Sequence, residues 1–146
     1  VFFGGHMIRS TATTQAVVSL SSGESEFYAS VKAASIGLGA VHMIRDLGIM
    51  MDTPVDLRMD ATAGIGIASR RGAGRIRHIH TPALWLQQAV QDRKVAMGKV
   101  LGAVNPADLG TKHVDRAVIV HAMKTCGFVT LQGESRLALR AQLTTA

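Results

Sequence analysis

The alternation of hydrophobic and polar positions predicts short strands at the beginning of the chain. Two apolar pieces flank Gly4 and Gly5 in VFFGGHMIRS, which predicts a β-hairpin because glycine supplies the positive φ that a tight turn requires. The run TTQAVVSL, residues 13–20, is rich in β-branched residues and predicts a third strand.

A long helix is expected to follow these strands. Ser21 and Glu24 form a capping-box pattern, with Ser21 as N-cap and Glu24 at the third helical position. The helix should run to about Leu47 and end at Gly48, since glycine is the preferred residue just after a helix.

The remainder of the chain alternates between strand and helix patterns up to Gly127. Strands are expected at 55–59 and 95–104, and RRGAGRIR (70–77) reads as a loop. Helices are expected at 61–69, at 80–94 with Thr81 as N-cap and Pro82 at the first helical position, from Asn105-Pro106-Ala107-Asp108 onward, and at 115–124. The resulting order, β-β-β-α-β-α-α-β-α, predicts an α/β (α+β) domain over residues 1–127 with a mixed sheet covered by helices, followed by a C-terminal tail at 128–146.

Length and composition agree with one such domain. The chain has 146 residues, 47% of them hydrophobic, which is enough for a core and too apolar for a disordered tail. We expect no membrane association, because no uninterrupted apolar run has the length of a bilayer span. Cys126 is the only cysteine, so no internal disulfide is possible, and we expect it to be a small buried residue. Because the sequence opens with VFF rather than methionine, we expect a segment of a longer protein such as a polyprotein.

Positive charge is concentrated in one region. The formal net charge is +6, and residues 61–91 contain no acidic residue but include Arg70, Arg71, Arg75 and Arg77. Such a patch suits contacts with nucleic-acid phosphates, and the alternative is a solvated loop that is basic without binding anything.

Three acidic residues stand at the ends of expected elements. Steps of three and four from Glu26 along the long helix meet only apolar residues, namely Ala29, Ala33, Ile36, Ala40, Ile44 and Leu47, so Glu26 is expected at the end of a core-facing stripe. Asp60 follows the strand 55–59, and Asp108 lies in the first turn of a helix. Each has a plain structural explanation as a cap or as a charge near a helix N-terminus. Taken together they suggest a Mg²⁺ site, since carboxylates gather only around a positive partner.

Five segments, in order, resemble one known family. They are VFFGGHMIRSTATTQAVVSLSS, SLSSGESEFYASVKAA, RMDATAGIGIA, RIRHIHTPALWLQQAVQDRKV and NPADLGTK. Together they resemble the ribonuclease H domain of the Pol polyprotein of copia-type long-terminal-repeat retrotransposons, over Val1 to about Gly127.

The resemblance implies a ribonuclease H-like fold and a site with two divalent metals, Mg²⁺ or Mn²⁺. It implies an endonuclease that cuts the RNA strand of RNA–DNA hybrids during reverse transcription. Of the family's four acidic ligands, the second, third and fourth correspond to Glu26, Asp60 and Asp108, and the first belongs to a strand that precedes the segment matching Val1. The implied partners are the reverse transcriptase and integrase portions of the same polyprotein, in an intracellular virus-like particle of the cytoplasm or nucleus.

Several further side chains are interpreted with this family in mind. Arg71, Arg75, Arg77, His78 and Lys112 are expected to hold the nucleic-acid backbone. His113 either contacts phosphate or is a solvated residue, and Asp115 could assist the three acids. His78 and His80 are a possible but unfavoured zinc pair, because alternate residues on a loop rarely converge without other ligands. Trp85 and Leu86 are expected in the core rather than stacked on bases.

Departures from the family pattern leave three hypotheses open. Ile8-Arg9-Ser10-Thr11 stands where the family has a tryptophan motif, and His80 replaces an aspartate. The first hypothesis is an active ribonuclease H that loses activity in Asp60→Asn. The second is a non-catalytic nucleic-acid-binding relic whose hybrid binding falls steeply with salt. The third is a structural domain that braces a polymerase and tolerates loss of all three acids.

Overall fold

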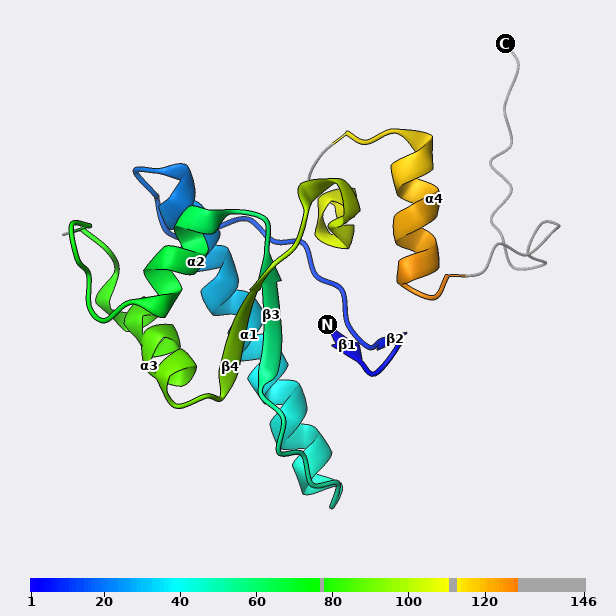
Figure 1. Ribbon diagram of the computed structural model, residues 1–146, viewed down its shortest axis with the longest axis horizontal. Helices are drawn as coiled ribbons and strands as arrows, with labels where there is room; N and C mark the ends of the chain where they lie inside the picture. Colours follow the sequence, from blue (N-terminus) through cyan, green and yellow to red (C-terminus); the bar gives the residue numbers. More distant parts are fainter. Residues whose placement is uncertain (77, 111–112, 129–146) are drawn as a thin grey trace, which may run out of the picture.

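The computed structural model of the chain describes residues 1–76, 78–110 and 113–128 (Figure 1). Four strands, four α-helices and three 3₁₀ segments occur in these ranges. In chain order they are β1 (Phe2–Phe3), β2 (His6–Met7), α1 (Ser22–Asp46), β3 (Val55–Met59), α2 (Thr62–Ser69), η1 (Thr81–Leu84), α3 (Trp85–Gln91), β4 (Val95–Lys99), η2 (Gly102–Val104), η3 (Pro106–Gly110) and α4 (Arg116–Thr125). The described part is therefore a mixed α and β fold with small sheets, as the α+β prediction required.

Both ends of α1 follow from local sequence. The Ser21 hydroxyl accepts a hydrogen bond from the Glu24 backbone N–H at 3.2 Å, which satisfies one of the unpaired donors of the first turn. At the other end Gly48 adopts a φ of 81°, and its N–H donates to the Arg45 carbonyl while Ile49 N–H donates to Ile44. This is the Schellman arrangement that glycine favours, and it confirms the predicted helix limits.

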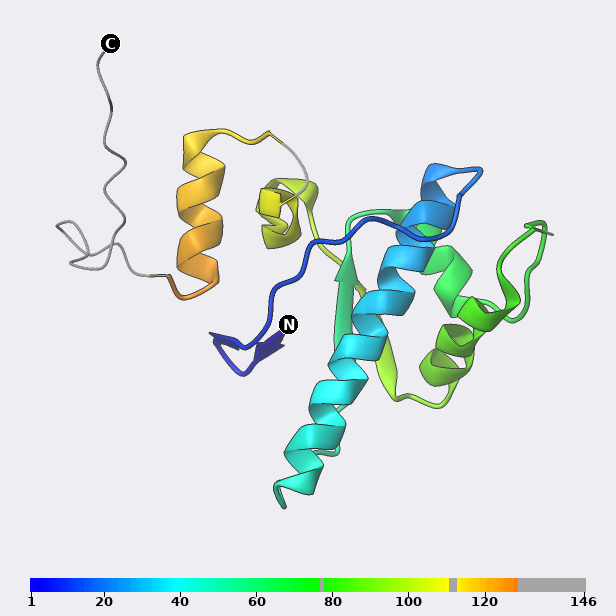
Figure 2. The same ribbon diagram turned by 180° about the vertical axis from the view of Figure 1, so that it is seen from behind.

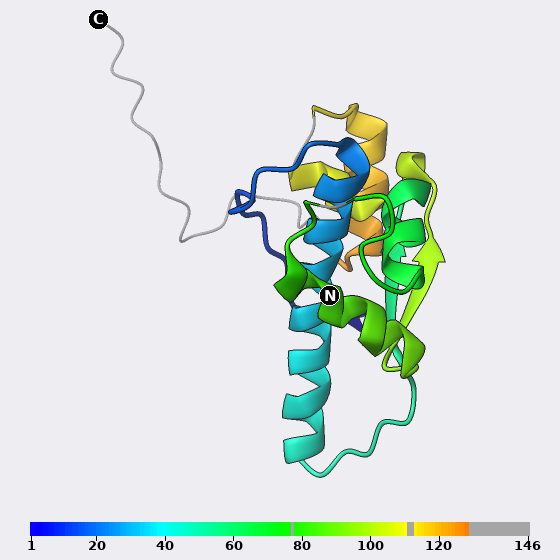
Figure 3. The same ribbon diagram turned by 90° about the vertical axis from the view of Figure 1, so that its left-hand side faces the viewer.

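A parallel pair of strands forms the centre of the fold. β3 and β4 pair in register from Val55 with Val95 to Met59 with Lys99. Parallel neighbours need a long crossover, and α2, η1 and α3 supply it. Seen from behind and from the side, α1 runs along one side of this pair (Figures 2 and 3).

The core lies between α1, the strand pair and α3. Phe27, Leu86 and Val95 are its most completely buried large apolar side chains. α1 approaches the sheet closely at Gly37, where a Cβ would lie only 2.7 Å from Val55 Cγ1. Burial of Leu86 was expected, but Trp85 is 37% exposed, so its predicted place in the core is wrong. The side chain of Trp85 instead lines a cavity between α1, α3 and the start of β3.

The predicted core-facing stripe of α1 is correct only in part, because Ala33 packs against the core but the fully buried positions are others. The buried positions of α1 are Gly23, Glu24, Phe27, Tyr28, Ser30, Ala34 and Gly37. Ala29 and Leu47, from the predicted stripe, are exposed. α1 is apolar around most of its circumference, so more than one set of positions satisfies a helical period, and packing against β3 and α2 selects between them.

The expected single mixed sheet is absent from the described residues. The hairpin is present as predicted, with Phe2 opposite Met7 and Phe3 opposite His6, but β1 and β2 pair only with each other. Residues 13–20 form no strand. A strand needs a neighbouring strand as hydrogen-bond partner for its backbone N–H and C=O groups. In this segment a side chain takes that place at one position, where the Gln15 amide donates to the Val17 carbonyl.

In the second half of the chain most predicted elements are present, but some are shorter than predicted or are 3₁₀ segments instead of α-helix. α2 and β3 lie where they were predicted. The helix expected over 80–94 begins with the 3₁₀ turn η1, and Thr81 is its first residue rather than its cap. β4 ends at Lys99 rather than at 104, and the helix expected from Asn105 is the 3₁₀ segment η3. α4 ends at Thr125 with Gly127 at a φ of 76°, which confirms its predicted closure. The proposed tail from 129 onward lies outside the described residues.

Among the described residues, α1 is the one helix long and apolar enough to cross a membrane by length and composition alone, a property that it shares with core helices of globular proteins. Its buried side chains give another reason for that apolarity. Phe27 and Ala34 belong to the core cluster shared with the sheet, as in the central helix of a globular fold.

Candidate functional site

Asp60 marks the carboxyl end of the strand pair. It directly follows β3, and the chain leaving β4 passes beside it, since Val100 N–H donates to the Met59 carbonyl at 2.9 Å. A Cβ placed on Gly102 would lie 3.7 Å from Asp60 Oδ2. Sites in open α/β folds lie at such strand ends, so the position of Asp60 suits a ligand or a catalytic carboxylate.

Glu26 lies at the same end of the fold. α1 and α2 touch closely at Gly64, where a Cβ would lie 3.1 Å from Glu26 Cβ and 2.5 Å from Met59 Cε. Gly64 is in the first turn of α2, which begins two residues after Asp60. The Glu26 side chain is half-buried. Two acids that are far apart in the sequence therefore flank the start of α2.

Asp108 lies in η3, a segment that follows β4. Its backbone N–H donates to the Asn105 carbonyl at 3.2 Å, and the Asn105 side chain accepts from Ala107 N–H at 3.2 Å. Asparagine thus opens this turn as predicted, and Asp108 is half-buried within it. Asp115 is the N-cap of α4 and is exposed, as is His113.

The donor chemistry of these acids suits a hard cation such as Mg²⁺. Glu26, Asp60 and Asp108 do not, however, form a metal-binding cluster in the structure. Among residues 1–76, 78–110 and 113–128, no three His, Cys, Asp or Glu side chains lie close enough together to hold a metal ion. Glu26 and Asp60 share one end of the fold without forming a ligand cluster with Asp108 there. The same finding gives no support to the zinc alternative at His78 and His80.

Among the residues that the structure describes, the most buried carboxylate is Glu24, which the sequence assigned only to the capping box. It is 1% exposed and accepts three hydrogen bonds: from Leu20 N–H at 2.9 Å, Tyr28 Oη at 3.0 Å and His78 Nε2 at 2.9 Å. The backbone donor Leu20 holds the pKa of Glu24 below its ordinary value, helped by His78 and Tyr28 and opposed by burial. A sequence signal existed, because Glu24 and Tyr28 are four residues apart and share a helix face.

Tyr28 links the Glu24 carboxylate to His80, in the segment that follows the arginine-rich loop of residues 70–77; this loop and residues 78–80 together are called the basic loop. Its hydroxyl donates to Glu24 and accepts from the His80 backbone N–H at 2.8 Å. Burial raises the pKa of the Tyr28 hydroxyl, and the neighbouring Glu24 carboxylate adds to this rise. Glu24 and Tyr28 together fasten residues 78–80 to the first turns of α1.

The loop predicted to hold nucleic acid is anchored at its other side by polar contacts. Arg71 Nε donates to Gln91 Oε1 at 2.9 Å, and Gln87 Nε2 donates to the Gly72 carbonyl at 3.0 Å. Arg70 turns inward, with Nη2 donating to the Ala73 carbonyl at 2.7 Å. These contacts hold the loop in a defined course.

The basic residues predicted to contact phosphate differ in how far their side chains are exposed to solvent. Arg71, Arg75 and His78 are exposed to solvent, whereas Arg70 is partly enclosed by the loop. Arg77 and Lys112, which were predicted to contact the backbone, lie outside the described residues. Cys126 is half-buried at the end of α4 rather than fully buried.

Comparison with models of protein families, with curated proteins and with solved structures finds no match to this chain.

Proposed function

We propose that this chain is a ribonuclease H-like domain of a copia-type retrotransposon Pol protein that cleaves the RNA strand of RNA–DNA hybrids. The observation that carries the proposal is the approach of Glu26 to Gly64, which puts this acid at the same end of the fold as Asp60. The resemblance predicts a ligand at each of these positions. The corresponding substrate is an RNA–DNA hybrid. The corresponding partners are the reverse transcriptase and integrase portions of the same polyprotein, and the corresponding location is a virus-like particle within the cell.

The described residues have separable tasks in this proposal. The resemblance assigns Glu26, Asp60 and Asp108 as metal ligands, and of these Glu26 and Asp60 share one end of the fold. A divalent metal held at that end would supply the chemistry that activates water and stabilises the leaving oxygen. Arg71 and Arg75 present positive charge to the phosphates, because both are exposed on the acid-free loop. Glu24 and Tyr28 keep that loop beside the first turns of α1, where Glu26 lies.

The second candidate is a domain of related fold that binds hybrids without cutting them. It is favoured by the lack of a group of three metal-binding side chains in the part of the chain that the structure describes. Its positive loop would still bind phosphates, so affinity alone does not distinguish the candidates.

A cleavage assay with a matched pair of variants separates them. The chain is incubated with Mg²⁺ and an RNA–DNA hybrid labelled on the RNA strand, beside Asp60→Asn and Asp56→Asn. Asp56 lies on β3, the strand that Asp60 follows, and its exposed carboxylate pairs with Arg58 at 2.9 Å. Asp56→Asn therefore removes one negative charge without altering the proposed site.

The proposal predicts RNA cleavage that Asp60→Asn lowers by about 100-fold or more while Asp56→Asn retains it. Binding without cleavage, with log affinity falling linearly with log salt, supports the non-catalytic candidate. Neither binding nor cleavage contradicts both.

A further inference from the structure

The end of the fold opposite Asp60 contains a cavity of about 460 Å³. It lies between the second half of α1, the beginning of β3, α3 and the turn into β4, roughly 16 Å along the strands from Asp60. Leu38 and Val41 of α1, Val55 of β3 and Ala89 of α3 give it apolar walls. Its volume falls in the range of small-molecule sites.

Trp85 provides an aromatic wall. It is the only tryptophan of the chain and is 37% exposed, whereas its neighbour Leu86 is fully buried. A large aromatic side chain that lines a cavity instead of entering the core offers a flat surface for stacking.

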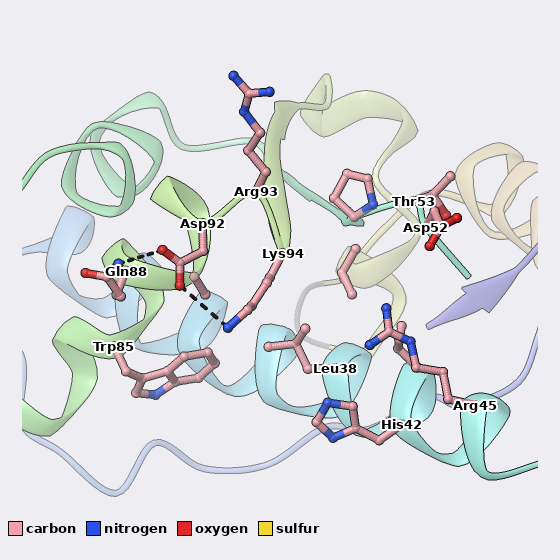
Figure 4. Close-up of a pocket in the computed structure, with 14 residues that line it drawn as sticks. Leu38, His42, Arg45, Asp52, Thr53, Trp85, Gln88, Asp92, Arg93 and Lys94 are labelled. Carbon is pink, nitrogen blue, oxygen red and sulfur yellow. Dashed lines mark hydrogen bonds and ion pairs between the residues drawn. The ribbon is translucent and has the colours of Figure 1, made fainter. Parts of the chain in front are cut away.

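Basic side chains stand around this wall. His42, Arg45, Arg93 and Lys94 line the cavity with two acids, Asp52 and Asp92. Figure 4 shows Lys94 extending toward Trp85, Arg45 and His42 on the side away from Trp85, and Arg93 directed away from the other side chains.

Lys94 and Arg45 are suited to bind an anion. Lys94 Nζ lies 3.5 Å from Asp92 Oδ2, and their side chains are 66% and 38% exposed. Exposed pairs of this kind are weak, so Lys94 can turn to a ligand at little cost. Asp92 has a second partner, the Gln88 amide at 2.7 Å. Arg45 is steadied by one hydrogen bond from Nη2 to the Met51 carbonyl at 2.9 Å.

We propose that this cavity binds a nucleotide, with its base against Trp85 and its phosphate between Lys94 and Arg45. A base has a flat apolar face that stacks on an aromatic ring regardless of sequence, and Lys and Arg are the usual partners of phosphate. Two cations that line the cavity, Lys94 and Arg45, match one phosphate better than a polyphosphate chain. The nucleotide is either free or the terminal unit of a single strand. This site is independent of the proposed hydrolysis at the other end of the fold.

Tryptophan fluorescence reports this site directly, because Trp85 is the single tryptophan. The chain is titrated with AMP, adenosine and inorganic phosphate, with excitation where the nucleotide does not absorb. We expect saturable quenching by AMP at roughly 0.1–1 mM. Adenosine should bind about tenfold more weakly, since it lacks the phosphate, and inorganic phosphate should leave the emission unchanged.

Variants assign the phosphate contact. Lys94→Ala should weaken AMP binding about tenfold, whereas Arg93→Ala, next in sequence but directed away, should bind AMP like the parent. Both side chains are exposed, so both variants should retain the circular dichroism spectrum of the parent.

A 5′-phosphorylated single-stranded tetranucleotide distinguishes the two sources of the nucleotide. Tighter binding than that of AMP identifies a strand end as the source, and equal or weaker binding identifies the free nucleotide. The proposal is overturned by non-saturable quenching, by equal affinity for AMP and adenosine, or by equal effects of the two substitutions.

Discussion

The Nε2 atom of His78 lies 2.9 Å from Oε2 of Glu24, and this contact joins the basic loop to the first turn of the longest helix. The two residues are 54 positions apart in the sequence. The carboxylate is buried, whereas the histidine side chain is 48% exposed. Glu24 thus serves as an internal anchor, and His78 carries the loop to the surface where nucleic acid is proposed to bind.

Acid should weaken this anchor. Because the folded-state pKa of Glu24 lies below its ordinary value of 4.5, the carboxylate contributes its full stability above that value and loses it as the pH falls through the lowered pKa. We expect Glu24→Gln to be less stable than the parent at pH 7, with a difference that shrinks below the ordinary glutamate range. Urea unfolding from neutral to acidic pH measures this, with Glu26→Gln as the control from the same turn. Parallel pH profiles for Glu24→Gln and the parent would contradict the anchor.

Removal of the histidine should loosen the loop. His78→Ala takes one of three donors from a buried carboxylate, and we expect hybrid affinity to fall about three- to tenfold because the loop must be ordered on binding. His78→Asn, whose amide can still donate, should restore most of the affinity. His121→Ala, an exposed histidine of α4, serves as control. If His78→Asn binds as weakly as His78→Ala, the histidine acts by direct phosphate contact instead.

Two glycines of α1 should respond oppositely to alanine. A Cβ at Gly37 would lie 2.7 Å from Val55 Cγ1, so Gly37→Ala should destabilise the fold by about 1–3 kcal/mol through overpacking. Gly39 has no atom within 4 Å of such a Cβ, so Gly39→Ala should stabilise by about 0.5–1 kcal/mol through its helix propensity. Chemical unfolding of both variants measures the pair. Equal signs would show that α1 does not pack on β3 at this position.

The turn between α3 and β4 carries a strained residue. Arg93 has a φ of 58°, and its N–H donates to the Val90 carbonyl while Lys94 N–H donates to Ala89, an arrangement that normally ends in glycine. Arg93→Gly should therefore stabilise the fold by about 0.5–1 kcal/mol. Arg93→Ala retains the strain and should give no comparable gain in urea unfolding. A stability loss in Arg93→Gly would mean that this residue does not hold the left-handed conformation in solution.

Sequence patterns predicted correctly those helix ends and strands that depend on residues close together in the chain. The Ser21 cap, Gly48 and Gly127 fixed helix ends correctly, and β3 was found from its alternation. Residues 13–20 failed as a strand because strand propensity is realised only beside a partner. Glu24 was misjudged because its third hydrogen-bond partner, His78, arrives from a distant loop. No local pattern distinguishes the buried Glu24 from the half-buried Glu26 on a helix that is apolar on most sides.

The most direct test is whether the acids at the carboxyl end of β3 hold a divalent metal. Mn²⁺ can be titrated into isotope-labelled chain while line broadening is followed in amide NMR spectra. We predict that the amides of Glu26, Asp60, Gly64 and Gly102 broaden first and that Asp60→Asn suppresses this effect, while Asp56→Asn does not. Broadening centred elsewhere, or none at these positions, would contradict a metal site at this edge and with it the proposed hydrolysis.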